Sequence, residues 1–233
     1  MQAIIMAGGR GTRLMPLTKD MPKPMVPIID KPILYYTINK LKEAGITDII
    51  LTLCYLGKKI EDTFGEGKDL GVRLRYVYED NPLGTAGSIK NASDLIRDDF
   101  MVLSGDAYTD MNFEALIDFH KKHRGIATIA SVRVSTPELF GNIFKNEKGL
   151  ITYFEEKPEK PKTNLVNAGI YVFDKRILRK IPKGFCDFSR NVFPKLIGKL
   201  YTFESDCFWS DVGNLESYYM TNYRVAQEYN KKG

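Results

Sequence analysis

The stretch of sequence that decides the fold reads AIIMAGGRGTRLMPLT, residues 3–18. Its apolar start has the length and composition of a buried β-strand. The strand ends in a loop with glycine at three of four successive positions, Gly8, Gly9 and Gly11. Glycine lets a backbone approach phosphate closely with its N–H groups turned outward. The stretch therefore predicts a strand followed by a loop that binds a polyphosphate.

Two basic side chains, Arg13 and Lys23, follow this loop. A planar guanidinium and an ammonium beside such a loop are what a polyphosphate leaving group requires. The Rossmann pattern fits poorly, because Leu14 stands at its third glycine and no acidic residue ends the next predicted strand, 49–54. The Walker pattern fails because no Lys-Ser or Lys-Thr follows the glycines. A solvated glycine-rich turn is the structural alternative.

The string from residue 8 to residue 27 resembles the signature of the sugar-1-phosphate nucleotidylyltransferases, the NDP-sugar pyrophosphorylases. Later motifs follow in the family's order over nearly the whole chain: EDNPLGTAG at 79–87, SGDAYTD at 104–110, FEEKP at 154–158 and WSDVGNLE at 209–216. This set is most similar to the mannose-1-phosphate guanylyltransferase branch. The resemblance implies transfer of a nucleotidyl group from an NTP to a sugar 1-phosphate, with release of pyrophosphate.

Two aspartates are the candidate metal ligands. Asp106 follows a predicted buried strand and a Ser-Gly turn, where a carboxylate is exposed at the sheet edge and can hold a hard cation. Magnesium needs only one or two protein carboxylates, because water and phosphate supply its other ligands. Asp211 lies between a strand and the last helix and resembles the family's second metal motif. The structural alternatives are a turn-forming aspartate at 106 and helix-start chemistry at 211.

Glu79, at the end of a predicted strand, is the candidate base-recognition residue. A carboxylate can accept hydrogen bonds from both N1–H and N2–H₂ of guanine, whereas uracil and thymine offer one N–H between two carbonyls. Glu79 therefore favours GTP, and glycine at 84 would let the base approach the backbone. A solvated loop carboxylate is the alternative interpretation.

A second group of residues resembles the family's sugar-phosphate wall. Lys157 would neutralise and orient a phosphate dianion that a nearby triphosphate repels, and Glu156 would accept hydrogen bonds from sugar hydroxyls. Gly141 and Asn167 resemble the remaining sugar contacts. The chain has Phe-Gly-Asn at 140–142 where the family often has Tyr-Gly-Val. The family's role for the glycine backbone therefore applies to Gly141, but the roles of the two neighbouring side chains do not carry over. Taken alone, Glu-Glu-Lys-Pro is an ordinary exposed turn.

The resemblance assigns each candidate a role. Arg13, Lys23, Asp106 and Lys157 are the expected catalytic residues, and Mg²⁺ held by Asp106 and Asp211 is the expected cofactor. The expected nucleotide-binding residues are Ala7, Gly8, Gly9, Gly11, Thr12, Arg13, Lys23, Glu79, Gly84 and Thr85. We expect one nucleotidyltransferase domain, with residues 1–135 as the nucleotide-binding core and 136–233 as the sugar-phosphate-binding part and closing helix.

Hydrophobic periodicity gives the same fold without the resemblance. Helices are predicted over 32–45, 58–64, 84–96 and 113–123, between strands over 48–54, 72–78, 100–103 and 127–134. This alternation predicts an α/β, Rossmann-like, mostly parallel sheet flanked by helices, with ligands beyond the carboxyl ends of its strands. From 143 to 173 strands dominate, which predicts a β-rich insertion that carries a binding wall, and the resemblance implies that this insertion binds the sugar. Helical spacing returns at 187–197, a short strand at 201–203, and an amphipathic helix with Asn214 as its cap at 214–229.

Composition limits the other partners. The net charge of +5 is spread along 233 residues, and no basic patch with interleaved aromatics indicates nucleic acid. No apolar run approaches the roughly 20 residues that span a bilayer, and no signal peptide precedes the first strand, so we expect a cytoplasmic protein without membrane contact. The three cysteines lack metal-ligand spacing.

Several residues have two interpretations. His120 and His123 have metal-ligand spacing, but a solvated helix end is favoured. Asp110 is expected to cap the helix that follows it. Tyrosines 218, 219, 223 and 229 are expected to pack against the domain, with a homo-oligomer contact as the alternative.

Two other functions remain open at this point. One is a nucleotidylyltransferase that uses UTP or dTTP with glucose 1-phosphate. The other is a non-catalytic sugar-nucleotide-binding regulatory subunit. Such a subunit would be expected to lack a metal carboxylate or the loop arginine, and this chain has all of them.

Overall fold

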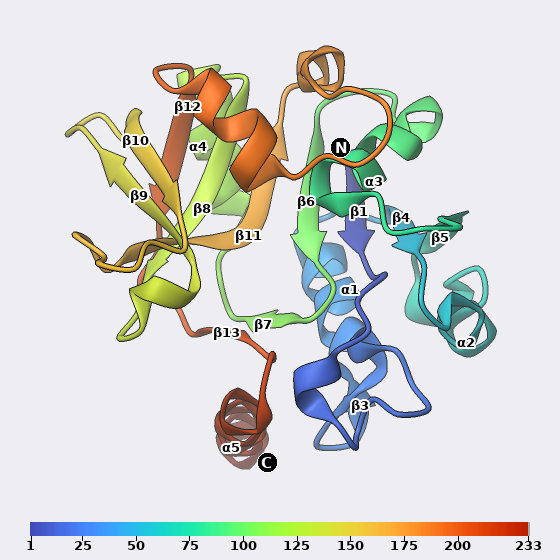
Figure 1. Ribbon diagram of the computed structural model, residues 1–233. Coiled ribbons are helices and arrows are strands. Elements are labelled where there is room, and N and C mark those ends of the chain that lie inside the picture. The colour runs from blue at the N-terminus through green and yellow to red at the C-terminus, as the bar shows by residue number, and fades with distance from the viewer. Residues whose placement is uncertain (233) are drawn as a thin grey trace.

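A nine-stranded mixed sheet forms the centre of the protein (Figure 1), in a computed structural model that describes residues 1–232 and the side chains through Asn230. Its parallel part has the order β6 (Phe100–Ser104), β1 (Gln2–Met6), β4 (Asp48–Leu53) and β5 (Arg73–Tyr78). Ile4 of β1 is paired with Ile50 on one side and Val102 on the other. A parallel sheet is covered on both faces, which explains why these strands read as continuous apolar runs.

Helices cover both faces of this sheet. On one face lie α1 (Ile33–Glu43), α2 (Gly57–Phe64) and α4 (Phe113–His123), which bury Leu34, Ile60 and Leu116 respectively in one core. On the other face lies α3 (Gly84–Asn91), whose Ile89 belongs to a second core. The predicted α/β class is confirmed, and the carboxyl ends of β1, β4 and β6 point to the bottom of Figure 1.

The predicted β-rich insertion extends the same sheet. β11 (Leu165–Phe173) lies antiparallel beside β6 and joins the parallel part to β8 (Ala127–Arg133) and β9 (Gly141–Lys145). β10 (Ile151–Glu156) pairs with β9, and β12 (Leu200–Glu204) runs parallel to β8. β11 contains an irregularity between Asn167 and Tyr171, where Gly169 has φ of 70°. This bulge turns part of β11 toward the end of β6, since an added Cβ on Gly169 would lie 3.5 Å from Cβ of Ser104.

The segment predicted as a helix over 187–197 is instead two short turns, Phe188–Val192 with π geometry and Phe193–Leu196 with 3₁₀ geometry. Pro194 cannot donate a backbone hydrogen bond, and a regular helix does not continue through it. Packing replaces helix propensity here, because the rings of Phe173 and Phe188 stack with centroids 4.9 Å apart.

Two expectations around α4 are wrong. Asn112, not Asp110, caps the helix by accepting a hydrogen bond of 3.0 Å from the backbone N–H of Ala115. Asp110 instead accepts from the backbone N–H of Phe208 at 2.8 Å. His120 does not lie at a solvated helix end: it is 4% exposed, and its Nδ1 lies 2.9 Å from Oγ1 of Thr128.

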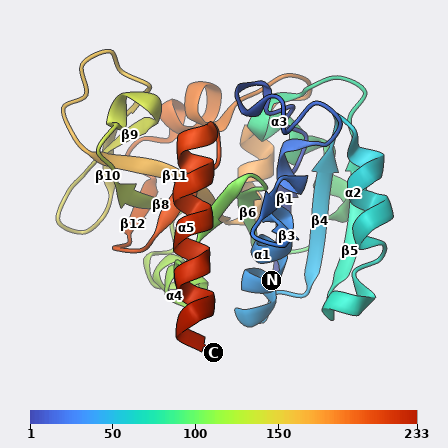
Figure 2. The same ribbon diagram turned by 90° about the horizontal axis from the view of Figure 1, so that it is seen from below.

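The last helix, α5 (Leu215–Lys232), crosses the front of the molecule in Figure 2. Its predicted cap is confirmed, because Oδ1 of Asn214 accepts from the backbone N–H of Ser217 at 2.8 Å. Tyr218 packs against the apolar cluster beneath α5, as expected, but Tyr219, Tyr223 and Tyr229 are each more than half exposed. None of the helices in residues 1–232 is long and apolar enough to cross a membrane.

Candidate active site

A two-stranded ribbon brings the predicted metal ligands together. β7 (Ala107–Thr109) starts directly after Asp106, and β13 (Trp209–Asp211) ends at Asp211. The two strands are antiparallel, and their register places Asp211 opposite Ala107. The backbone N–H of Val212 donates to the carbonyl of Asp106 at 3.1 Å. Two carboxylates that are 105 positions apart in the sequence therefore share one edge of the sheet.

Lys23 connects these two carboxylates. Its Nζ donates to Oδ2 of Asp106 at 2.5 Å and to Oδ1 of Asp211 at 3.0 Å. The side chain of Lys23 is only 8% exposed, and those of Asp106 and Asp211 are 24% and 31% exposed. The protein thus places one ammonium group between two largely buried carboxylates.

The pKa shifts follow from this arrangement. Burial opposes the charge on Lys23, but attraction to Asp106 and Asp211 outweighs it and raises the pKa of Lys23. Burial also opposes ionisation of Asp106, yet the Lys23 ammonium holds the pKa of Asp106 below its ordinary value. The pKa of Asp211 is raised, first by burial and then by repulsion from Asp106. One positive charge therefore does not fully neutralise the pair.

The donor set fits a divalent cation of the hard type. Two carboxylates are what Mg²⁺ takes from a protein when phosphate and water supply the other oxygens. Within the described side chains no group of three or more His, Cys, Asp or Glu residues could hold a metal. Ser104 also donates a short hydrogen bond to Oδ1 of Asp106 and so orients this carboxylate.

The glycine loop lies next to the carboxylate pair. Gly11 has φ of 67°, and an added Cβ would lie 2.9 Å from Cγ2 of Thr18, so only glycine fits without strain. Gly9 is exposed, with no protein atom within 4 Å of the place where its Cβ would be. The carbonyl of Gly9 accepts from the backbone N–H of Lys23 at 3.3 Å. The loop is therefore closed underneath by the Lys23 segment and open above.

Arg13 reaches the same place from the other side of the loop. A Cβ added to Gly213 would lie 3.1 Å from a terminal nitrogen of Arg13, and the guanidinium is close enough to lower the pKa of Asp211 in part. The structure thus brings together Arg13, Lys23, Asp106 and Asp211. Gly213 is not among the residues predicted from the sequence, although its place directly after WSDV was available as a signal.

Glu79 follows β5 at the same end of the sheet. Its Oε2 accepts a 3.3 Å hydrogen bond from the backbone N–H of Leu83, while its buried Oε1 has no hydrogen-bond partner among the described residues. Cys54 lies between Glu79 and the glycine loop. The pKa of Cys54 is raised, first by burial and then by the charge of Glu79. On its other side, a Cβ added to Gly8 would lie 3.1 Å from Cβ of Cys54. An acceptor without a donor thus lies beside the loop.

The two residues proposed next to Glu79 have clear structural roles. A Cβ on Gly84 would lie 2.7 Å from the carbonyl oxygen of Cys186, so this glycine is required by packing. The hydroxyl of Thr85 lies 3.2 Å from Oδ1 of Asp187 and accepts from the backbone N–H of Phe188 at 2.9 Å. These contacts explain Gly84 and Thr85 without a ligand.

The residues of the predicted sugar wall lie on β9, β10 and β11. Gly141 pairs with Glu156, and a Cβ on Gly141 would lie 2.8 Å from Oε2 of Glu156. Asn167 shapes the β11 bulge, because its Oδ1 accepts from the backbone N–H of Gly169 at 2.9 Å. Lys157 is exposed and has φ of 49°, a left-handed conformation that is uncommon for a residue with a side chain.

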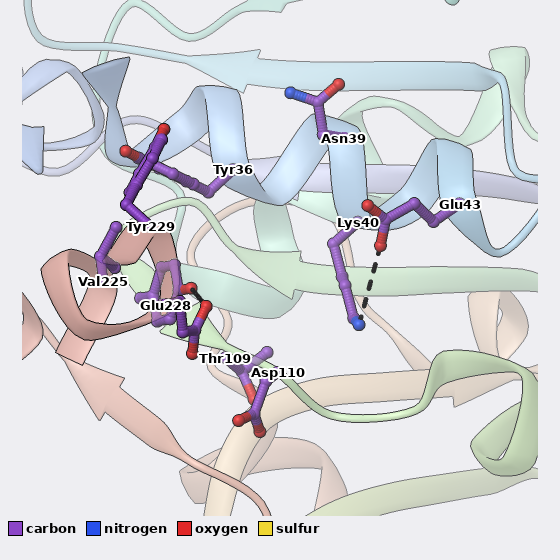
Figure 3. A pocket seen from close by; sticks show the side chains of 10 residues that line it. Tyr36, Asn39, Lys40, Glu43, Thr109, Asp110, Val225, Glu228 and Tyr229 are labelled. Atoms are coloured by element: carbon purple, nitrogen blue, oxygen red, sulfur yellow. Dashed lines mark hydrogen bonds and ion pairs between the residues drawn. The ribbon is translucent and has the colours of Figure 1, made fainter. Parts of the chain in front are cut away.

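A hollow of about 400 Å³ lies on the other side of the ribbon, between α1, β7 and α5 (Figure 3). Lys40 and Glu43 on α1 form an ion pair of 3.8 Å at one side of it. Glu228 of α5 accepts from the hydroxyl of Tyr108, and Asp110 lies at the lower end of the view. No sequence motif indicates this hollow, because its walls come from three distant segments.

Comparison with known proteins finds that residues 2–228 match the family described as nucleotidyl transferase. A mannose-1-phosphate guanylyltransferase from Mycobacterium tuberculosis is 38% identical over 222 residues, which cover 93% of this chain and 62% of the relative. A mannose-1-phosphate guanyltransferase from Saccharomyces cerevisiae is 37% identical, over 91% of this chain and 61% of the relative. The chain thus spans about three fifths of the length of these curated relatives.

Two solved structures are similar to this chain over nearly the whole length of both proteins. HddC from Yersinia pseudotuberculosis, complexed with GMP-PN, has a TM-score of 0.83 and 30% identity, with 96% of this chain and 99% of that chain covered. A protein from Bacillus anthracis, provisionally named a glucose-1-phosphate thymidylyltransferase and complexed with sucrose, has a TM-score of 0.87 and 28% identity, with 95% and 94% covered.

Proposed function

Because the chain belongs to the nucleotidyl transferase family, we propose that it transfers a guanylyl group from GTP to mannose 1-phosphate and releases pyrophosphate. The observation that carries this proposal is the arrangement of Asp106, Asp211 and Lys23 beside an open glycine loop. Such a site places backbone N–H groups, and two carboxylates that can hold a divalent cation, where a triphosphate and a phosphate monoester must meet. Curated relatives of the chain carry the name of this activity.

The reaction requires placement and charge neutralisation more than covalent chemistry. In the proposed mechanism the glycine loop binds the triphosphate through backbone N–H groups, and Arg13 stabilises the leaving pyrophosphate. Lys23 neutralises charge near the α-phosphate. The sugar-phosphate oxygen attacks the α-phosphorus in line, and no side chain forms a covalent bond to the nucleotide.

Asp106 and Asp211 are the residues that would hold Mg²⁺. When bound, this ion supplies charge neutralisation at the phosphate oxygens. Lys23 already occupies the space between the two carboxylates. This contact supports the view that the pair is built to receive positive charge.

Guanine recognition rests on Glu79. Its buried Oε1 has no protein donor within the described part of the chain, and a guanine base would provide N1–H and N2–H₂. HddC, which the chain covers over nearly its whole length, was solved with GMP-PN. These observations favour GTP over UTP or dTTP.

The sugar phosphate would lie against Gly141, Glu156, Lys157 and Asn167. Lys157 is exposed and has no ion-pair partner among the described side chains, so its charge is available to a phosphate. Glu156 lies next to Gly141, whose missing side chain leaves room at the carboxylate. Mannose 1-phosphate is the proposed substrate because the names of these relatives contain it.

The test is a matrix of GTP, ATP, CTP and UTP, with dTTP added, against mannose 1-phosphate, glucose 1-phosphate and a heptose 1-phosphate, with pyrophosphate release as the measurement. We expect the fastest release with GTP and mannose 1-phosphate, dependent on Mg²⁺ and lost in Asp106→Asn. Preference for UTP or dTTP would support the alternative enzyme. Binding of GDP-mannose without any release from the matrix would support a non-catalytic regulatory subunit.

A further inference from the structure

A second hollow, of about 510 Å³, lies at the end of the sheet opposite the glycine loop. Its walls are the end of α4, the starts of β8 and β12, and the 3₁₀ turn Lys175–Lys180, which follows β11. β11 and β6 are antiparallel, with Phe173 paired to Phe100 at this end and Ile170 paired to Leu103 near the other. α4, β8 and β12 lie in the upper left of Figure 1, whereas β7 and β13 lie below them, under β11 and β6.

The lining of this hollow is strongly basic. Half of the ten residues that line it are arginine or lysine, and none of the ten is acidic: the basic ones are Arg124, Arg176, Arg179, Lys180 and Lys199. The whole chain has 34 basic and 29 acidic residues, so an even mixture would place both signs here. The hollow in Figure 3 differs in this respect, because both signs line it: the basic Lys40 and the acidic Glu43, Asp110 and Glu228.

Most of these cations lack a protein counter-charge. Arg176 pairs with Asp174 at 2.6 Å. Arg124, Arg179, Lys180 and Lys199 have no carboxylate within 4.0 Å among the side chains described through residue 230. Four like charges around one concave surface repel one another, and a bound anion would remove that repulsion.

An aromatic surface completes the hollow. The rings of His123 and Tyr201 have centroids 4.8 Å apart, and His123 stacks on Phe119 at 4.0 Å. Gly125 lets the chain pass directly under Tyr201, because an added Cβ would lie 2.7 Å from Cδ2 of that ring. The tyrosine ring is therefore held in place beside the cations, where a planar or apolar part of a ligand could contact it.

We propose that this hollow binds a small molecule that carries a diphosphate or triphosphate group. Four unpaired cations match a ligand with several negative charges better than a monoanion. The volume falls within the range of roughly 300–1,000 Å³ that is usual for small-molecule pockets. Free pyrophosphate and a nucleoside diphosphate share this chemistry. A nucleotide would also place its base against Tyr201, whereas pyrophosphate would use the cations alone.

Backbone amide signals of Gly125 and Gly198, both in the lining, provide the test in ¹H–¹⁵N NMR spectra of the whole chain. Pyrophosphate, GDP and, as an ionic-strength control, sodium chloride are added separately. We expect saturable shifts of both signals with pyrophosphate, GDP or both, and none with the salt. Tighter binding of GDP than of pyrophosphate identifies a nucleotide as the better ligand. Because these glycines lie far from the glycine loop, the result does not depend on the proposed catalytic function.

Charge variants separate this site from general attraction. Arg179→Ser combined with Lys199→Ser should weaken binding at least about tenfold. The matched variant with Lys160→Ser and Lys162→Ser, which removes two exposed lysines elsewhere, should bind normally. The exchange variant with Arg179→Lys and Lys199→Arg should also bind and so controls for folding.

Three results would overturn the proposal. One is the absence of shifts up to about 10 mM ligand, beyond the affinity of a specific site. Another is equal loss of binding in both serine pairs. The third is binding of an RNA oligonucleotide that depends on Arg179 and Lys199 while pyrophosphate and GDP do not bind, which would make the surface a nucleic-acid site.

Discussion

Replacement of Lys23 with methionine tests the cation site directly. Methionine keeps an unbranched side chain of similar shape but removes the ammonium that bonds Asp106 at 2.5 Å and Asp211 at 3.0 Å. Removal of one partner from a fully buried ion pair costs about 3–5 kcal/mol. Because the two carboxylates retain 24% and 31% of their exposure, water relieves part of this cost, and we expect about 2–3 kcal/mol at pH 7.5 in EDTA.

Magnesium should reverse part of this loss. A ligand that binds only the folded state stabilises it by RT ln(1 + [L]/Kd), which is about 2.7 kcal/mol at 100 times Kd. In Lys23→Met no ammonium competes for the carboxylates, so the gain in free energy of unfolding on adding Mg²⁺ should be larger than in wild type. Urea denaturation with EDTA and with Mg²⁺ measures both values. Lys160→Met, at an exposed position, is the charge-matched control and should show neither effect.

The pH dependence adds an independent check. Burial and mutual repulsion already raise the pKa of Asp211, and loss of Lys23 should raise it further. A carboxylate whose folded-state pKa is raised contributes stability below its unfolded-state pKa and loses it as pH rises through the folded-state value. The variant should therefore be closer to wild type at pH 5 than at pH 8. A difference below about 0.5 kcal/mol in EDTA, or equal gains with Mg²⁺, would refute the view that Lys23 fills a cation site.

Three other substitutions test separate parts of the site and fold. Glu79→Gln should lower kcat/KM for GTP roughly 10- to 100-fold, the value of one charge-assisted hydrogen bond, with little change for UTP; an equal effect on both nucleotides would contradict base recognition. Lys157→Ala should lower kcat/KM for the sugar phosphate by about 30-fold, or roughly 2 kcal/mol, and activity within threefold of wild type would rule the role out. Burial lowers the pKa of His120 although Asp99 and Asp174 raise it in part, so wild type should lose stability as pH falls below about 6.5. His120→Gln should flatten this loss in denaturation curves at pH 7 and 5, and an unchanged slope would show that other groups cause it.

The elements with strong local signals were predictable. The helix expected over 113–123 is α4, because its apolar spacing buries Phe113, Leu116 and Ile117 in one core. The pairing of Asp106 with Asp211 was expected from the resemblance to the family's two metal motifs, and the β7–β13 ribbon brings the two residues together. The cap of α4 was missed because Asp110 and Asn112 are both good capping residues, and only the ribbon contact to Phe208 removes Asp110 from that role.

Contacts between distant segments were not predictable in the same way. Lys23 is expected to bind the nucleotide, and no local motif indicates its two protein partners, which are 83 and 188 positions away. The basic hollow has no motif either, because its cations come from three distant segments, which the pairing of β8 with β11 and with β12 brings together. The turns at 188–196 were not predicted because aromatic packing outweighs helical periodicity there.

The β7–β13 ribbon has a consequence for biosynthesis. One of its strands follows Asp106 and the other ends at Asp211, so the carboxylate pair exists only after the ribosome has added residue 211. Arg224 of α5 then bonds Asp110 at 3.0 Å and fixes the ribbon from outside. Until Asp211 and Arg224 have emerged from the exit tunnel, a nascent chain can form the glycine loop but not the paired aspartates.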